Sequence, residues 1–196
     1  MQRAIFAVVL GLLCGGMALA AEPLKVQPWV YDPDNTGVSE ASWNAKIGLP
    51  DNNGKANQGL YLSKMGSTST NAAAGAEINF FGTLTELGFD FRNDSHCGAG
   101  APRFNVYTTS GVYYFYGCMY GVHTPVPGQP NWTRVRFAAA DGFASDGSPA
   151  LTSFEDVVVT GIDIVFDEGT DVGVGYAVLD NIDINGTLIG KPGAAK

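Results

Sequence analysis

The chain has 196 residues, 45% of them hydrophobic, and its 11 Lys and Arg against 19 Asp and Glu give a formal net charge of −8. This acidic balance, without a basic cluster, argues against nucleic acid and anionic membrane surfaces as partners, because both require grouped Lys or Arg. The length suits one domain with a core of its own.

Residues 1–20 have the three zones of a secretory signal peptide. Arg3 gives a positive start, residues 4–13 are apolar, and Ala18 and Ala20 are the small residues that a signal peptidase reads. A membrane anchor is the alternative, but glycines interrupt an apolar run shorter than the roughly 20 residues of a spanning helix. We expect cleavage after Ala20, no membrane span afterwards, and a secreted or periplasmic protein.

The expected mature domain covers residues 21–190, with a frayed tail at 191–196. It keeps two of the three cysteines, Cys97 and Cys118. In an oxidising compartment such a pair most simply forms a disulfide bond. Two free buried thiols are the alternative.

Short runs rich in β-branched and aromatic residues recur along the chain, separated by Gly, Asn, Asp and Pro. This pattern is typical of an antiparallel sandwich or barrel. From these candidate runs we expect about nine strands, and at most one turn of helix, near 72–76. The runs are 26–30, 59–63, 77–81, 84–92, 103–108, 112–118, 133–138, 156–166 with a kink at Gly161, 175–184, and a short last strand at 187–189.

Two turns are specified by their residues. Thr109-Ser110-Gly111 separates the runs 103–108 and 112–118, and a three-residue loop ending in Gly predicts a hairpin. A Cys97–Cys118 bridge would tie the loop that enters this hairpin to the strand that leaves it. Asn185-Gly186 predicts a second, two-residue turn.

Seven aromatic residues fall within 104–120. Because side chains alternate along a strand, Tyr113 and Phe115 share one face, and Tyr114 and Tyr116 share the other. One set belongs to the core, and the other set, if exposed, is a platform for stacking sugar rings. The alternative is that both sets are covered. The candidate ligand-binding residues are Tyr107, Tyr113, Tyr114, Phe115, Tyr116 and Trp132.

Three clusters of Asp, Asn and Glu, at 32–35, 51–53 and 167–171, offer the oxygen ligands that Ca²⁺ prefers. None of them matches an EF-hand loop, and ordinary turn chemistry is the alternative. The loop 167–173 is the most acidic segment. Its candidate ligands for a structural Ca²⁺ are Asp167, Glu168 and Asp171.

No catalytic residue can be assigned from the sequence. The two histidines, His96 and His123, are read as exposed loop residues, and no Gly-x-Ser-x-Gly elbow is present. A pair of carboxylates could hydrolyse glycosides, but the pattern does not say which pair converges. Asp163 and Asp183 alternate with Ile and are expected to face solvent. The carboxylates in or beside strands are Glu86, Asp90, Asp163, Asp167, Glu168, Asp180 and Asp183.

The segments CGAGAPRFNV at 97–106 and VFDEGTDVGVGYAVLDNIDINGT at 165–187 resemble a group of bacterial secreted β-sandwich proteins that have no assigned activity. Residues 179–184 (LDNIDI) also resemble the last strand of jelly-roll carbohydrate-binding modules. That second resemblance implies a jelly-roll sandwich, and it implies a structural role for Asp180, near a Ca²⁺ ion or a loop backbone.

Together these observations predict a single all-β antiparallel sandwich of jelly-roll type with one disulfide bond. The function that we expect first is that of an exported, non-catalytic binding module for a glycan or cell-surface polymer. An enzyme acting on polysaccharide through two carboxylates is the first alternative. A structural or assembly subunit of the cell surface or matrix is the second.

Overall fold

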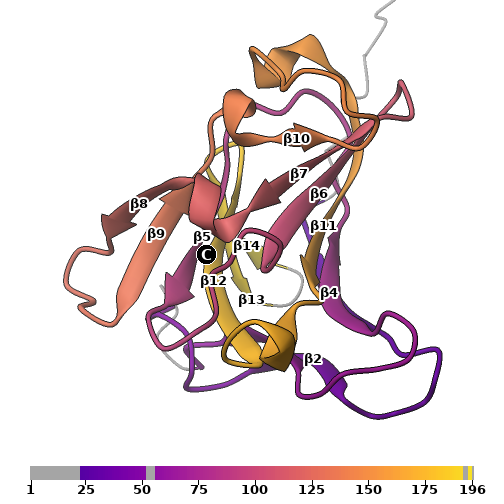
Figure 1. Ribbon diagram of the computed structural model, residues 1–196. Coiled ribbons are helices and arrows are strands. Elements are labelled where there is room, and N and C mark those ends of the chain that lie inside the picture. The colour runs from indigo at the N-terminus through magenta and orange to yellow at the C-terminus, as the bar shows by residue number, and fades with distance from the viewer. Residues whose placement is uncertain (1–22, 52–55, 192–193, 196) are drawn as a thin grey trace, which may run out of the picture.

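The computed structural model describes residues 23–51, 56–191 and 194–195 (Figure 1). Strands β1 to β14 and four short 3₁₀ turns make up the regular structure of these ranges. The expected signal peptide lies outside them. No helix in the described part of the chain is long and apolar enough to span a membrane.

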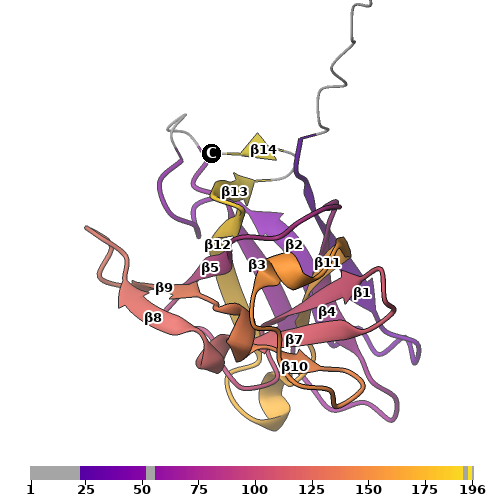
Figure 2. The ribbon, with the colours of Figure 1, turned by 90° about the horizontal axis from the view of Figure 1, so that it is seen from above.

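The strands form two antiparallel sheets, which lie side by side when viewed from above (Figure 2). In sheet A the strands follow the order β1, β4, β11, β6, β7, β10. Their bounds are Val26–Tyr31 (β1), Ala73–Ile78 (β4), Val159–Phe166 (β11), Arg103–Thr108 (β6), Tyr113–Gly117 (β7) and Phe143–Ala144 (β10).

Sheet B has the order β14, β13, β12, β5, β9, β8, and β3 pairs with both β12 and β2. The bounds are Ala194–Ala195 (β14), Thr187–Lys191 (β13), Tyr176–Ile184 (β12), Leu87–Arg92 (β5), Trp132–Arg136 (β9), Val122–Pro125 (β8), Gly59–Lys64 (β3) and Ser39–Asn44 (β2). The 3₁₀ turns are Cys118–Tyr120 (η1), Ala139–Asp141 (η2), Phe154–Asp156 (η3) and Gly169–Asp171 (η4).

The main hydrophobic core fills the space between the sheets. At its centre Phe89 of β5 packs against Phe104 of β6, and Phe137 contacts both rings. A smaller apolar cluster of Leu49, Val126, Trp132 and Val178 lies apart from this core. Each of these clusters removes apolar surface from water, which is the main driving force for folding.

The expected all-β sandwich is confirmed, and several local predictions agree with the structure. β6 and β7 form the predicted hairpin, and Gly111 in its loop has a φ of 83°. Asn185 and Gly186 have φ values of 54° and 77°, as a tight turn between antiparallel strands requires. The pairing of β11 with β6 shifts register between Val159 and Gly161, where the kink was expected.

The helical turn expected at 72–76 is wrong, because these residues belong largely to β4. Ala and Gly are poor strand formers, but tertiary packing decides here. Ala74 and Ala76 are buried in the core, and Gly75 lies directly beneath the indole ring of Trp29. Small residues are needed where a ring and a neighbouring strand approach the backbone this closely.

The strand count also differs from the nine expected. β2, β8 and β10 were not predicted, and Ala194–Ala195 pair with β13 within the segment that was expected to fray. β10 has two residues and all four residues of β8 are exposed, so neither carries the alternating pattern of a half-buried strand.

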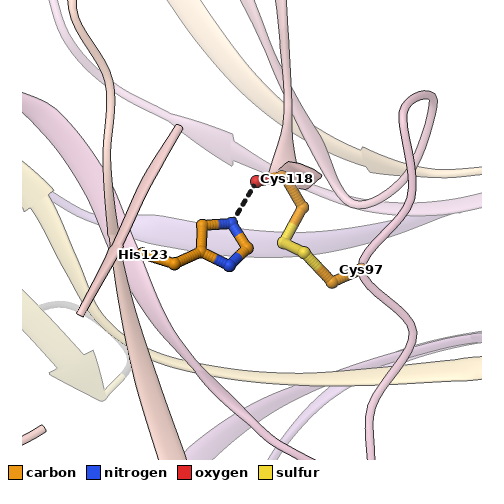
Figure 3. Close-up of side chains that lie close together, drawn as sticks. All are labelled: Cys97, Cys118 and His123. Carbon is orange, nitrogen blue, oxygen red and sulfur yellow. Dashed lines mark hydrogen bonds between the residues drawn. A yellow bond between two sulfur atoms is a disulfide. The ribbon is translucent and has the colours of Figure 1, made fainter. Parts of the chain in front are cut away.

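The predicted disulfide between Cys97 and Cys118 is present, with 5.2 Å between the two Cα atoms (Figure 3). His123 lies beside it, and its Nε2 donates to the carbonyl oxygen of Cys118 at 2.8 Å. The ring of His123 also meets Phe91 edge-on. The bridge therefore ties the loop before β6 to the turn after β7.

Candidate functional site

The outer face of sheet A carries a continuous line of side chains that runs across the strands. The pairing of the strands determines which side chains belong to this line, because each residue lies directly opposite the next one on the neighbouring strand. We call it the cross-strand row. Its members are Gln27 (β1), Glu77 (β4), Asp163 (β11), Asn105 (β6), Phe115 (β7) and Phe143 (β10).

One end of the cross-strand row is aromatic. The ring of Tyr113 lies 5.5 Å from that of Tyr107 and 5.1 Å from that of Phe115, measured between centroids. Phe143 is 53% exposed, and its ring lies 4.9 Å from that of Tyr120, which is 43% exposed. These five rings, which we call the aromatic surface, are contributed by β6, β7, β10 and η1.

A shallow, open depression of about 550 Å³, which we call the groove, is bordered by part of the aromatic surface. Phe115, Tyr120 and Phe143 form its apolar wall, and Arg103 and Glu168 its charged wall. Ala99 and Gly100, from the loop that follows Cys97, line it as well. The disulfide therefore anchors a segment that shapes the groove.

Three hydrogen bonds and an aromatic ring hold the side chain of Arg103 in place. Its Nη1 donates to Asp167 Oδ1 at 2.8 Å and to the carbonyl oxygen of Gly100 at 2.7 Å, and its Nε donates to Asn105 Oδ1 at 3.0 Å. The guanidinium lies 5.5 Å from the centre of the Phe115 ring. Arg103 thus presents a fixed cation, already paired with a carboxylate, beside an aromatic ring.

The other end of the cross-strand row is polar. Asp163 Oδ2 accepts a hydrogen bond from the Tyr107 hydroxyl at 3.0 Å. Burial raises the pKa of the Asp163 carboxyl, and the charge of Glu77 raises it further, while hydrogen bonds from Tyr107 and Trp29 oppose the shift. Since β4 has no side chain at Gly75, the Trp29 indole lies against the sheet on this side.

The acidic loop does not gather its carboxylates around one point. Asp167 binds Arg103, Glu168 accepts from His96 Nε2 at 3.0 Å, and Asp171 binds Lys64 at 2.9 Å. Each carboxylate therefore has its own protein cation or ring nitrogen. This pairing ties the loop between β11 and β12 to β6, to β3 and to the loop that contains His96.

Asp180 lies apart from that loop, fully buried in β12 of sheet B. Its carboxylate accepts hydrogen bonds from the backbone nitrogens of Leu49 and Asn181, each at 2.6 Å. It thereby ties the loop before β3 to the last long strand. The contact with a loop backbone that the resemblance implied is present.

Of the other two oxygen-rich clusters, the structure describes residues 32–35 in full and residues 51–53 in part. Asp32 accepts from Thr36 and from the backbone nitrogen of Gly37, which are contacts within a turn, and Asp34 accepts from the distant Thr70. In the cluster 51–53, positions 52 and 53 lie outside the described residues.

Among the described residues, one group of three metal-type ligands has its ligand atoms within 4.8 Å of one another: Cys97, Cys118 and His123. Its two sulfur atoms are bonded to each other in the disulfide (Figure 3). Metal ligation by cysteine requires thiolates, so this group cannot hold an ion while the bridge is intact.

The predicted aromatic candidates divide into two groups. Tyr107, Tyr113 and Phe115 are half-buried on the outer face of sheet A, as the alternation of side chains allowed. Tyr114 and Tyr116 point into the core, with exposures of 7% and 0%. They were wrong as surface platforms, because the side chains of this face of β7 meet sheet B.

Trp132 was also wrong as a surface platform. It is 6% exposed and packs in the smaller apolar cluster with Leu49 and Val126. Three rings near this face were not among the candidate ligand-binding residues: Trp29, Tyr120 and Phe143. Phe143 lies in a segment with the composition of a loop, and only its pairing with Phe115 brings it to the site.

Two further expectations need correction. Asp183 was expected to face solvent but is 4% exposed, and Arg136 Nε contacts its carboxylate at 2.9 Å. His96 was expected to be an exposed loop residue. Its side chain is largely buried, donates to Glu168 and meets Phe166 edge-on.

No protein-family model matches the sequence, and no curated protein matches it. Among solved structures, the chain is similar to a family 11 carbohydrate-binding module of a cellulosomal cellulase of Clostridium thermocellum. The identity is 15% and the TM-score 0.47, over 85% of this chain and 88% of that chain. It is also similar to a beta-1,2-glucanase from Parabacteroides distasonis, with 17% identity and a TM-score of 0.44, over 82% of this chain and 23% of that chain.

Proposed function

We propose that this protein is an exported, non-catalytic module that binds glycans on the outer face of sheet A. The observation that supports this most directly is the aromatic surface: five neighbouring rings on an open sheet face, beside a groove and next to fixed hydrogen-bonding groups. Export rests on the leader pattern of residues 1–20.

The chemistry of the surface suits a saccharide. A sugar ring has apolar C–H faces that stack on aromatic rings, and hydroxyl groups around its edge that need polar partners. Here the rings of Phe115 and Phe143 adjoin Asn105 and Asp163 in the same cross-strand row. A chain lying along the row would meet apolar rings first and hydrogen-bond acceptors next.

The test is retention by polysaccharide. We expect the purified mature protein to be retarded in native gels that contain a soluble polysaccharide. We expect Phe115→Ala and Phe143→Ala each to weaken binding about tenfold, which corresponds to about 1.4 kcal/mol. This is close to half of the free energy of burying a whole Phe side chain.

Phe81→Ala is the matched control. Phe81 is 74% exposed and lines a different hollow together with Ile184 and Thr187. Its loss should leave retention unchanged. If no polysaccharide in a broad panel retards the protein, or if Phe81→Ala weakens binding as much as the other two variants, the proposal is wrong.

A further inference from the structure

The polar end of the cross-strand row holds two carboxylates that no protein cation neutralises. Glu77 and Asp163 are direct partners on β4 and β11. Side chains in such positions have Cβ atoms about 5 Å apart. In the described part of the chain, no ion pair joins either carboxylate to Lys, Arg or His.

Some acidic groups elsewhere in the domain do have such partners. Asp90 and Asp183 bind arginines in sheet B, and the three acids of the loop after β11 bind Arg103, His96 and Lys64. Among the described residues, Glu77 and Asp163 have no such ion pair, and they lie on the surface proposed to bind glycans.

Arg103 is a cation beside the row that already has a carboxylate partner. Arg103 is the neighbour of Asn105 on the same face, but its Nη1 already donates to Asp167. Glu168 adds a further carboxylate to the wall of the groove. The surface therefore offers aromatic rings, hydrogen-bond acceptors and two carboxylates without an ion pair to any residue that the structure describes.

We infer that the ligand of this face is an uncharged polysaccharide, and that Glu77 and Asp163 act as its specificity determinants by rejecting chains that carry carboxylate or sulfate groups. The inference rests on the proposed function and names the class of glycan. Carboxylate oxygens accept strong hydrogen bonds from hydroxyl groups, whereas an anionic sugar in the same position meets like charge.

A matched pair of polymers tests this. Hydroxyethyl cellulose and carboxymethyl cellulose share one backbone and differ in charge, and methyl-esterified and de-esterified polygalacturonan form a second such pair. Within any pair that binds, we expect the neutral member to be retained at least about tenfold more strongly at low salt. About 0.5 M NaCl should narrow the difference, because it screens exposed charges.

The variant Glu77→Gln should reduce the difference within a pair at least about threefold, because it removes one of the two charges that oppose the anionic member. Glu86→Gln removes the same charge from sheet B, where Glu86 lies beside a hollow lined by Leu87 and Arg136, and it should not alter the difference. Circular dichroism checks that both variants fold.

The two proposals fail in different ways. If no polysaccharide is retained, either in these pairs or in the broad panel, glycan binding itself is wrong. If the protein binds glycans but holds the anionic member as tightly as the neutral one, or if Glu86→Gln acts as strongly as Glu77→Gln, only the inference about charge is overturned.

Discussion

At the scale of single residues, Asp163 is a carboxylate whose partial burial lowers stability and whose proposed role is to select the ligand. Its carboxyl is partly buried, and its hydrogen-bond donors, Tyr107 and Trp29, are both uncharged. Burial raises its pKa above the ordinary value of 3.8. The folded state therefore holds the proton more tightly than the unfolded chain does.

The sign of the pH effect follows from this shift. The contribution of Asp163 to stability is fully present below pH 3.8 and is lost as the pH rises through the higher pKa of the folded state. We expect Asp163→Asn to raise the free energy of unfolding at pH 7 and to have less effect at pH 3. Urea unfolding at both pH values measures this, and an equal change at both would contradict it.

The alternation of side chains correctly separated the faces of residues 113–116, because the period of a strand is two. It could not say which face is open. That depends on sheet B, which packs on Tyr114 and Tyr116 through residues distant in the sequence, such as Phe137. Periodicity predicts which residues share a face but not what covers it.

At the scale of elements, β4 shows how a strand can form from residues that favour other structures. A Cβ on Gly75 would collide with the Trp29 ring and with the carbonyl oxygen of Ile164. We expect Gly75→Val to destabilise the protein by about 1–3 kcal/mol, the usual cost of overpacking. It should also displace Trp29, which a change in tryptophan fluorescence would report.

Gly161→Ala is the comparison for that substitution. Gly161 lies in β11, next to β4, and a Cβ there meets only Tyr107 at an ordinary van der Waals distance of 3.8 Å. We expect the melting temperature of the Gly161→Ala variant to stay near that of the wild type. Similar losses in both variants would show that any side chain in this sheet is harmful and that the contact with Trp29 is not the cause.

The partners of the carboxylates in the acidic loop could not be predicted from the sequence. Its composition suggested a calcium site, because Asp and Glu close together in sequence are the usual sign of one. The residues that pair with them lie 64, 72 and 107 positions away. Contacts at such separations depend on the tertiary fold, and no local pattern contains them.

At the scale of the whole molecule, the disulfide is the main covalent constraint. Cys97 and Cys118 are 21 residues apart, and closing a loop of this size stabilises a fold by roughly 3 kcal/mol in the chain-entropy model. We expect a reductant, or the double substitution Cys97→Ala and Cys118→Ala, to lower the urea midpoint accordingly.

Glycan retention should fall as well, because Ala99 and Gly100 line the groove within the closed loop. The reductant should have no effect on the double variant, which serves as the control. A wild-type protein whose midpoint is the same with and without reductant would contradict the prediction.

The sandwich class and the disulfide could be predicted from the sequence, because strand periodicity and cysteine pairing are strong signals. The order of strands in the sheets could not. β10 joins sheet A through two residues, yet it brings Phe143 next to Phe115. An edge strand this short has no period to detect.

The register between β7 and β10 has a consequence for recognition. Phe115 and Phe143 are held opposite each other by backbone pairing, so the step between them equals the spacing of adjacent strands, about 4.8 Å. The spacing between backbone positions along the cross-strand row is set by the sheet and not by side-chain rotamers. A polymer with a regular repeat can contact several positions of the row at once. Its affinity should increase with each added sugar until the row is covered.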